Sequence, residues 1–167
     1  MDRTPYDPRT DGADCDHCPM ARWAGGLDGC VPAKRARTPG RLILGTAPGA
    51  QDEKSGKTFV GEEGTELNDA IASASLRRTA YDEDNVIACR PPKDKWALIS
   101  AQLRRDKKAG ISPDHEQHPT IHCRPRLDRS LARASYIIGL GGQAATALMG
   151  GNQSIMAIRG GPVTLDS

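Results

Sequence analysis

The amino-acid sequence predicts an α/β fold, a three-layer αβα sandwich with a short parallel sheet at its centre. Three short apolar runs are predicted to be strands, and segments with helical periodicity separate them. The order strand, helix, strand, helices, strand, helix is typical of a parallel sheet with crossover helices on both faces. With 167 residues, the chain fits a single domain that can bury a sizeable core.

Each element is predicted from a local pattern. The strands are apolar runs bounded by glycine, proline or charged residues, and such runs are too short for helices. The helices carry apolar residues three or four positions apart, and the one near Cys123 is expected to begin there because Pro125 fits only a first helical turn. The predicted strands lie at 42–44, 84–88 and 135–140, and the predicted helices at 64–76, 95–109, 123–133 and 143–149.

The composition predicts a cytoplasmic protein without a membrane segment. No apolar run approaches the ~18 residues that a membrane span requires, and the N-terminus lacks the apolar core of a signal peptide. Residues 1–14 are polar and rich in proline and aspartate, so we expect them to be irregular or disordered. The predicted domain then covers residues 15–167.

Charge alone does not identify a nucleic-acid binder, because the net charge is only +2, from 23 basic and 21 acidic residues. The basic residues nevertheless gather in three runs. These runs are either solvated faces or contacts to a phosphate backbone. They lie within 34–41, 104–108 and 124–133.

The five cysteines indicate metal or cluster ligation rather than disulfides, because cytosolic thiols are kept reduced. Cys15 and Cys18 form a C-x2-C pair, which can present two thiolates to one metal centre. Residue types alone do not choose between zinc and an iron-sulfur cluster. The histidines at 115, 118 and 122 are either alternative ligands or exposed loop residues.

A candidate ligand site follows the first strand, in the loop Gly45–Gly49 (Gly-Thr-Ala-Pro-Gly). Loops at the carboxyl ends of strands are where open α/β sheets bind their ligands. The nearby Ser-Gly-Lys-Thr at 55–58 is not a nucleotide-binding P-loop, because Gln51 occupies the position where that motif needs glycine. Phe59, the only phenylalanine in the chain, follows in a glycine-flanked segment.

Four features then coincide between Cys15 and Arg159. They are the N-terminal C-x2-C, G-x-A-P-G followed by G-K-x-F-V-G, the run Asn85-Val-x-x-Cys-Arg-Pro-Pro, and Cys123 at a helix start before the strand containing Ile-Gly-Leu-Gly. Together they resemble the iron-sulfur uracil-DNA glycosylases of bacteria and archaea, a family that includes domains of phage DNA polymerases. The resemblance implies the family's three-layer fold and a role in base excision repair.

The resemblance also implies the cofactor and the partner. A [4Fe-4S] cluster would be ligated by Cys15, Cys18, Cys89 and Cys123, which leaves Cys30 outside; a zinc ion with the same four ligands is the alternative. The partner would be uracil-containing DNA. We expect no membrane partner, and either a monomer or a part of a longer polymerase or repair assembly.

In the pocket that the resemblance implies, Phe59 would stack on uracil and the Asn85 amide would hydrogen-bond to its O4 and N3. Ala47 and Gly49 would supply backbone donors and allow close approach to the base. Such enzymes flip uracil out of the stack and cut the N-glycosidic bond with a positioned water.

The sequence departs from the family pattern in two places. Thr46 stands where the family usually has an acidic residue that positions water, and Asp52 or Glu53 in the same loop is a candidate to compensate. The family's His-Pro-Ser segment and last strand are expected to be missing. These departures predict weak or absent turnover. The alternatives are a catalytically silent, cluster-bearing DNA-binding module, associated with a phage DNA polymerase, or a zinc-stabilised α/β protein unrelated to DNA.

Overall fold

The sheet at the centre of the fold has three parallel strands, as the sequence predicts. The computed structural model describes residues 5–23, 29–110, 118–151, 154–158 and 160–164. In these residues β1 (Gly40–Gly45) lies between β2 (Asp82–Asn85) and β3 (Ala134–Gly139). Both neighbours are parallel to β1, and the last residues of β1 and β2, Gly45 and Asn85, are register partners.

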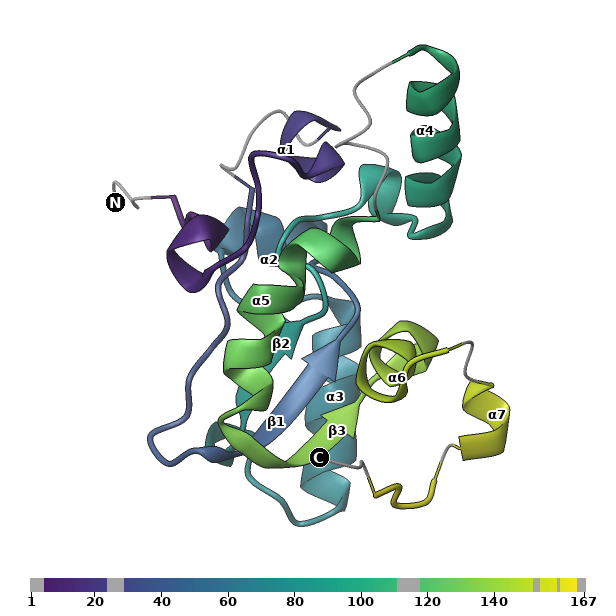
Figure 1. The fold of residues 1–167 in the computed structure, drawn as a ribbon. Helices are drawn as coiled ribbons and strands as arrows, with labels where there is room; N and C mark the ends of the chain where they lie inside the picture. The colour runs from purple at the N-terminus through teal and green to yellow at the C-terminus, as the bar shows by residue number, and fades with distance from the viewer. Residues whose placement is uncertain (1–4, 24–28, 111–117, 152–153, 159, 165–167) are drawn as a thin grey trace.

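Helices cover both faces of this sheet and complete the three layers (Figure 1). On one face, Ile43 of β1 packs with Leu67 and Ile71 of α3 (Glu62–Ser73). On the other face, Leu42 and Leu44 share a core with α5 (Pro119–Leu131) and α6 (Gly141–Met149). The remaining helices are η1 (Pro8–Asp11), α1 (Pro19–Trp23), α2 (Ala50–Ser55), η2 (Arg78–Ala80), η3 (Pro92–Asp94), α4 (Ala97–Lys108) and α7 (Ile155–Ile158). No helix of the described residues is both long and apolar enough to cross a membrane.

The structure corrects the predicted bounds of two elements. The second strand ends at Asn85 rather than continuing to residue 88, because Val86 and Ile87 donate to the backbone oxygens of Gly45 and Thr46 in a loop. The helix expected to start at Cys123 begins at Pro119, where a first-turn proline and the His118 cap favour initiation. Pro125 therefore lies inside α5.

The described N-terminal segment packs against α5, although the sequence predicts residues 1–14 to be irregular. Residues 1–4 lie outside the described part of the chain. Asp7 caps η1, the Asp14 N–H donates to His122 O (2.9 Å), and Arg129 Nη1 donates to Thr10 O (3.1 Å). These bonds bring the Cys15–Cys18 turn toward the helix that carries Cys123.

β2 is a buried strand of polar residues, Asp-Glu-Asp-Asn, and its two aspartates are paired by arginines that are distant in the sequence. Arg126, in one of the basic runs, is only 1% exposed and donates to Asp84 Oδ1 (2.7 Å). Arg133 Nε donates to Asp82 Oδ2 (2.8 Å). Arg126 is therefore neither on a solvated face nor available to a phosphate, contrary to both interpretations of that run.

Candidate functional site

A pocket of about 760 Å³ lies at the carboxyl end of β1, where the sequence predicts a ligand site. The β1–α2 loop, the start of α3, Trp96 and Gly141 form its walls. Five of the predicted site residues are in its lining: Thr46, Ala47, Gly49, Asp52 and Phe59.

Asn85 lies behind this lining and is only 2% exposed. Within the described residues, its Oδ1 has no hydrogen-bond partner. A Cβ atom added to Gly45 would lie 2.6 Å from both Asn85 Oδ1 and Phe59 Cε1, so the amide and the ring meet at this glycine. Leaving a buried acceptor unpaired typically costs about 1–3 kcal/mol, which makes Asn85 a candidate for binding an external donor.

Phe59 has an unusual backbone conformation at the edge of the pocket. Its φ of 50° lies in the left-handed region, which bulky residues rarely adopt, and its side chain is 6% exposed. A Cβ on Gly64 would lie 1.9 Å from Phe59 O, so the first turn of α3 can approach this carbonyl only with glycine at that position. Such strain persists where neighbouring contacts over-determine the conformation.

Asp52 holds the two ends of the loop together. Its Oδ2 accepts from the Gly49 N–H (3.2 Å) at the start of α2, and its Oδ1 accepts from the Val60 N–H (2.8 Å) just after Phe59. α2 itself is a six-residue helix within a segment that the sequence predicts to be a loop. Thr46 Oγ1 lies near Gly141 in the same lining, 3.9 Å from where a Cβ on Gly141 would stand.

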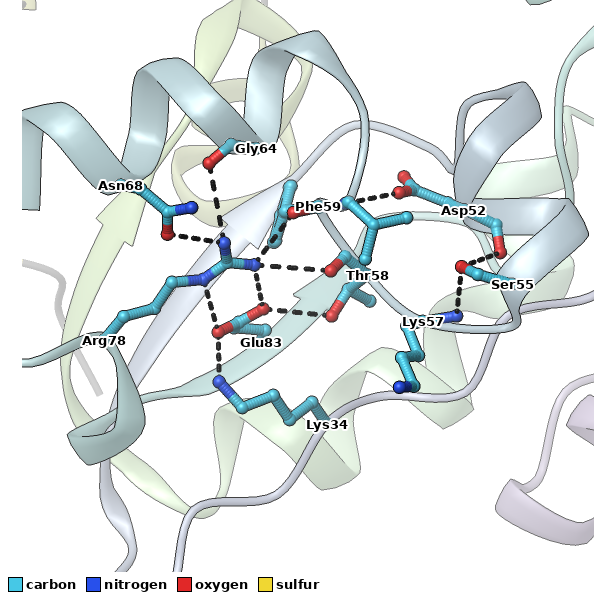
Figure 2. A network of polar contacts seen from close by, with 11 residues as sticks. Lys34, Asp52, Ser55, Lys57, Thr58, Phe59, Gly64, Asn68, Arg78 and Glu83 are labelled. Carbon is cyan, nitrogen blue, oxygen red and sulfur yellow. Dashed lines mark hydrogen bonds and ion pairs between the residues drawn. The ribbon is translucent and has the colours of Figure 1, made fainter.

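Sequence reasoning missed the polar network beneath Phe59. Glu83 is 0% exposed and receives hydrogen bonds from Arg78, Lys34 and Thr58 (Figure 2). Burial tends to raise the pKa of Glu83, but the hydrogen bonds from Arg78 and Lys34 outweigh it and lower the pKa. The only sequence signal was a charged residue beside a predicted buried strand, since a buried carboxylate requires a partner.

All five cysteines are buried and belong to one core cluster. The Cys18 N–H donates to Cys15 O (3.2 Å), which forms the expected turn, and Cys30 Sγ lies 2.9 Å from Cys89 Sγ. Burial, and then the thiols of Cys89, Cys123 and Cys18, raise the pKa of Cys15 to about 12. The four predicted ligands therefore lie within electrostatic range of one another, with Cys30 beside them.

The donor set of four buried thiols fits both groups that the sequence leaves open, because four thiolates can hold a tetrahedral zinc ion or an iron-sulfur cluster. In the described part of the chain, no three Cys, His, Asp or Glu side chains are placed to hold one metal ion.

The described histidines considered as alternative metal ligands contact residues other than the cysteines. His118 caps α5, and its ring nitrogen accepts from the Thr120 N–H (3.3 Å). His122 is buried rather than exposed, with Nδ1 3.4 Å from Asp14 Oδ2. His115 lies outside the described residues.

Two of the three basic runs are largely engaged within the protein. In the first, Lys34 pairs with Glu83, and Arg35 Nη1 donates to Ser130 Oγ (2.9 Å). In the third, Arg124 pairs with Asp128, and Arg126 and Arg133 pair with β2. The second run lies on α4, where Arg104, Arg105, Lys107 and Lys108 are exposed.

Comparison with known proteins identifies similar sequences. The family model of the Uracil DNA glycosylase superfamily matches residues 34–163. A type-4 uracil-DNA glycosylase of Pyrobaculum aerophilum is 35% identical over 81 residues, 48% of this chain and 40% of that protein. The Thermotoga maritima enzyme of the same name is 24% identical over 123 residues, 73% of this chain and 56% of its own length. The chain thus spans about half the length of these curated relatives.

Proposed function

This chain belongs to the uracil-DNA glycosylase superfamily, and from that premise we propose that it recognises uracil in DNA and hydrolyses the bond between the base and its sugar. The relatives named type-4 uracil-DNA glycosylase support this activity. Attack of water on C1′ forms a C–O bond, while the C1′–N1 bond breaks and its electron pair leaves with uracil. The water proton is released as the new hydroxyl forms.

The observation that carries this proposal is the unpaired, buried Oδ1 of Asn85 beside the Phe59 ring. Oδ1 would accept from uracil N3–H, and the amide nitrogen would donate to uracil O4. Cytosine presents an acceptor at N3 and a donor at C4, so the same amide would mismatch both atoms. Phe59 would supply the stacking face for a flipped base.

The test is release of uracil from an oligonucleotide with one uracil, measured as alkali-labile cleavage at protein excess. We expect product above a buffer control and none from the cytosine-containing oligonucleotide. Replacing Asn85 with alanine (N85A) should lower the rate roughly 10²-fold, the usual cost of removing one aligned polar group. An equal rate for N85A and the unsubstituted protein, with both folded, contradicts the assignment of Asn85.

We further propose that Cys15, Cys18, Cys89 and Cys123 hold a [4Fe-4S] cluster. Bound there, the cluster would supply a structural tie between the N-terminal segment, the chain after β2 and α5. Iron and sulfide content, and absorbance near ~400 nm, measure its presence in protein purified without oxygen.

The fifth cysteine provides a matched control, because Cys30 is as buried as the others and touches Cys89. C15A, C89A and C123A should each lose iron, whereas C30A should retain it. Loss of iron from C30A with retention in C89A would reassign the ligand set. A colourless protein with one bound zinc would contradict the cluster and support zinc as the metal at this site.

Thr46 favours a second candidate function, a silent module that binds DNA for a polymerase or repair assembly. A hydroxyl in the pocket can orient water, but it supplies no negative charge to a cationic sugar. This candidate predicts salt-dependent affinity for uracil-containing DNA without base release. Release of uracil in the cleavage assay above eliminates it.

A further inference from the structure

Arg78 binds the backbone of Phe59 from beneath the proposed stacking ring. Its Nη2 donates to Phe59 O (3.0 Å) and Thr58 O (3.3 Å), at the residue with the strained φ and the one before it. Its guanidinium carbon also lies 5.9 Å from the centre of the Phe59 ring. Arg78 therefore contacts both the main chain and the ring of the proposed stacking residue.

The other donors of Arg78 fix the guanidinium plane in place. Nη1 donates to Asn68 Oδ1 (2.8 Å) and reaches Gly64 O (3.5 Å) on α3. Nε and Nη2 donate to the two oxygens of Glu83 (2.9 and 2.7 Å), forming a bidentate pair. Figure 2 shows these bonds converging on a single guanidinium from a helix, a loop and a strand. Such a planar fork is specific to arginine, because lysine carries a single ammonium group.

The contacts of Arg78 with Thr58, Phe59 and Glu83 form a clamp on the loop, and Glu83 connects this clamp to Asn85. It lies on β2 two residues before Asn85, so the two side chains project to the same side of the strand. The backbone of Lys34 pairs with Glu83 on the outer edge of β2, and the Lys34 ammonium binds its carboxylate. Thr58 Oγ1 donates to Glu83 Oε2 (3.1 Å). The strand that carries the amide thus also holds the loop that carries the ring.

We propose that Arg78, oriented by Glu83, is a positioning residue that sets Phe59 against the base, an inference that rests on the proposed recognition of uracil. Substituting Arg78 keeps the Phe59 ring in the protein but removes the contacts that fix the position of that ring. The Asn85 amide distinguishes uracil from cytosine only while the ring holds the base against it. Removing the clamp should therefore lower the preference for uracil over cytosine by about tenfold, because a base-stacking contact no longer holds the base in register with that amide.

A double-mutant cycle between Arg78 and Phe59 tests this inference. Fluorescence anisotropy measures the affinity of single-stranded oligonucleotides that differ only in one uracil or cytosine. R78Q and F59A should each reduce the preference about tenfold, and R78Q/F59A should reduce it no further than F59A. Equal effects of R78Q in the presence and absence of the Phe59 ring overturn the proposal.

R133Q is the matched control, because Arg133 pairs with a buried carboxylate of the same strand but on the side that faces α5. It should lower the thermal midpoint without changing the preference. If R78Q does not fold, R78K and N68A weaken the clamp more gently and should reduce the preference in proportion. An unchanged preference in folded R78K contradicts the requirement for a fork.

A second readout separates this inference from the proposed function. Phe59 is the only phenylalanine, so 4-fluorophenylalanine gives one ¹⁹F resonance that reports the ring without any ligand. R78Q or R78K should shift or broaden that resonance, whereas R133Q should leave it unchanged. A shifted resonance in a protein that does not prefer uracil refutes the proposed function alone. An unshifted resonance in folded R78Q refutes the positioning role.

Discussion

Thr46 is the pocket residue whose chemistry bears most directly on the proposed hydrolysis. It shares the pocket lining with Asp52, whose two carboxylate oxygens already accept hydrogen bonds from the Gly49 and Val60 N–H groups. These hydrogen bonds hold α2 and the segment after Phe59 in place, so the Asp52 carboxylate is already used in stabilising the loop. A carboxylate introduced at residue 46 would face the pocket without those competing bonds.

Replacing Thr46 with glutamate (T46E) should raise the rate of uracil release roughly 10²-fold, because a negative charge stabilises the developing positive charge on the sugar. T46Q is the control, since it adds the same volume without the charge. Single-turnover release from the uracil oligonucleotide is the measurement. Equal rates for T46E and T46Q would contradict an electrostatic role for this position.

At the level of elements, the predictable parts of the fold are those built from apolar periodicity. β1, α3 and α6 lie within a few residues of their predicted positions, because their buried faces are apolar and local in sequence. β3 also lies close to its predicted position, although none of its six residues is fully buried; its Ile137 and Ile138 are partly buried. The sequence predicts the second strand too far along the chain, at 84–88, where the apolar residues after β2 lie. The residues of β2 itself are polar, and its aspartates are neutralised by arginines that lie far away in the sequence. α2 was missed because six residues between glycines show no helical period.

The residues of the candidate site also divide into those that local sequence predicts and those that it does not. The motif residues of the β1–α2 loop and Phe59 were found because they follow a strand and carry unusual residue types. Arg78 and Glu83 were not, because a buried ion pair has no local pattern and becomes visible only when the loop, α3 and β2 are brought together.

α4 is the element best placed to contact a DNA backbone. Its basic residues are exposed, and Trp96, directly before it, lines the pocket. Reversing two charges (R104E/R105E) should weaken binding and make the slope of log affinity against log salt shallower by about 1.4 for single-stranded DNA. R9E/R124E, which changes the net charge equally at ion-paired positions, is the control. If the slope of log affinity against log salt is identical for both variants, α4 does not contact the DNA backbone.

Across the whole molecule, β2 joins the two helical layers electrostatically. Asp82 and Asp84 pair with arginines of the α5 side, and Glu83 pairs with Arg78 on the α3 side. Breaking a buried pair by removing one partner typically costs about 3–5 kcal/mol. The stability of the fold should therefore depend on the ionisation of Asp82 and Glu83: burial tends to raise their pKa values, but their hydrogen-bonded partners outweigh it and lower them.

The lowered pKa of Glu83 fixes the direction of that dependence. Its pair contributes full stability above the unfolded pKa, about 4.3 for glutamate, and loses it as the pH falls through the lower folded value. E83Q should be less stable at pH 7 by about 3 kcal/mol, and the difference should narrow below about pH 4. Urea unfolding at pH 7, 5 and 3.5 measures it. D69N, at an exposed site on α3, is the control and should change the free energy of unfolding at pH 7 by less than about 0.5 kcal/mol.

The acidic composition of β2 also has a consequence for the order in which the chain assembles. Three carboxylates in four residues repel a second copy of the strand and resist early collapse into an apolar nucleus. Glu83 finds Arg78 only five residues away, but Asp82 and Asp84 are paired only when Arg133 and Arg126 arrive from 51 and 42 residues further along the chain. We therefore expect β2 to join β1 late in folding, so that the part of the site that carries Asn85 is completed last.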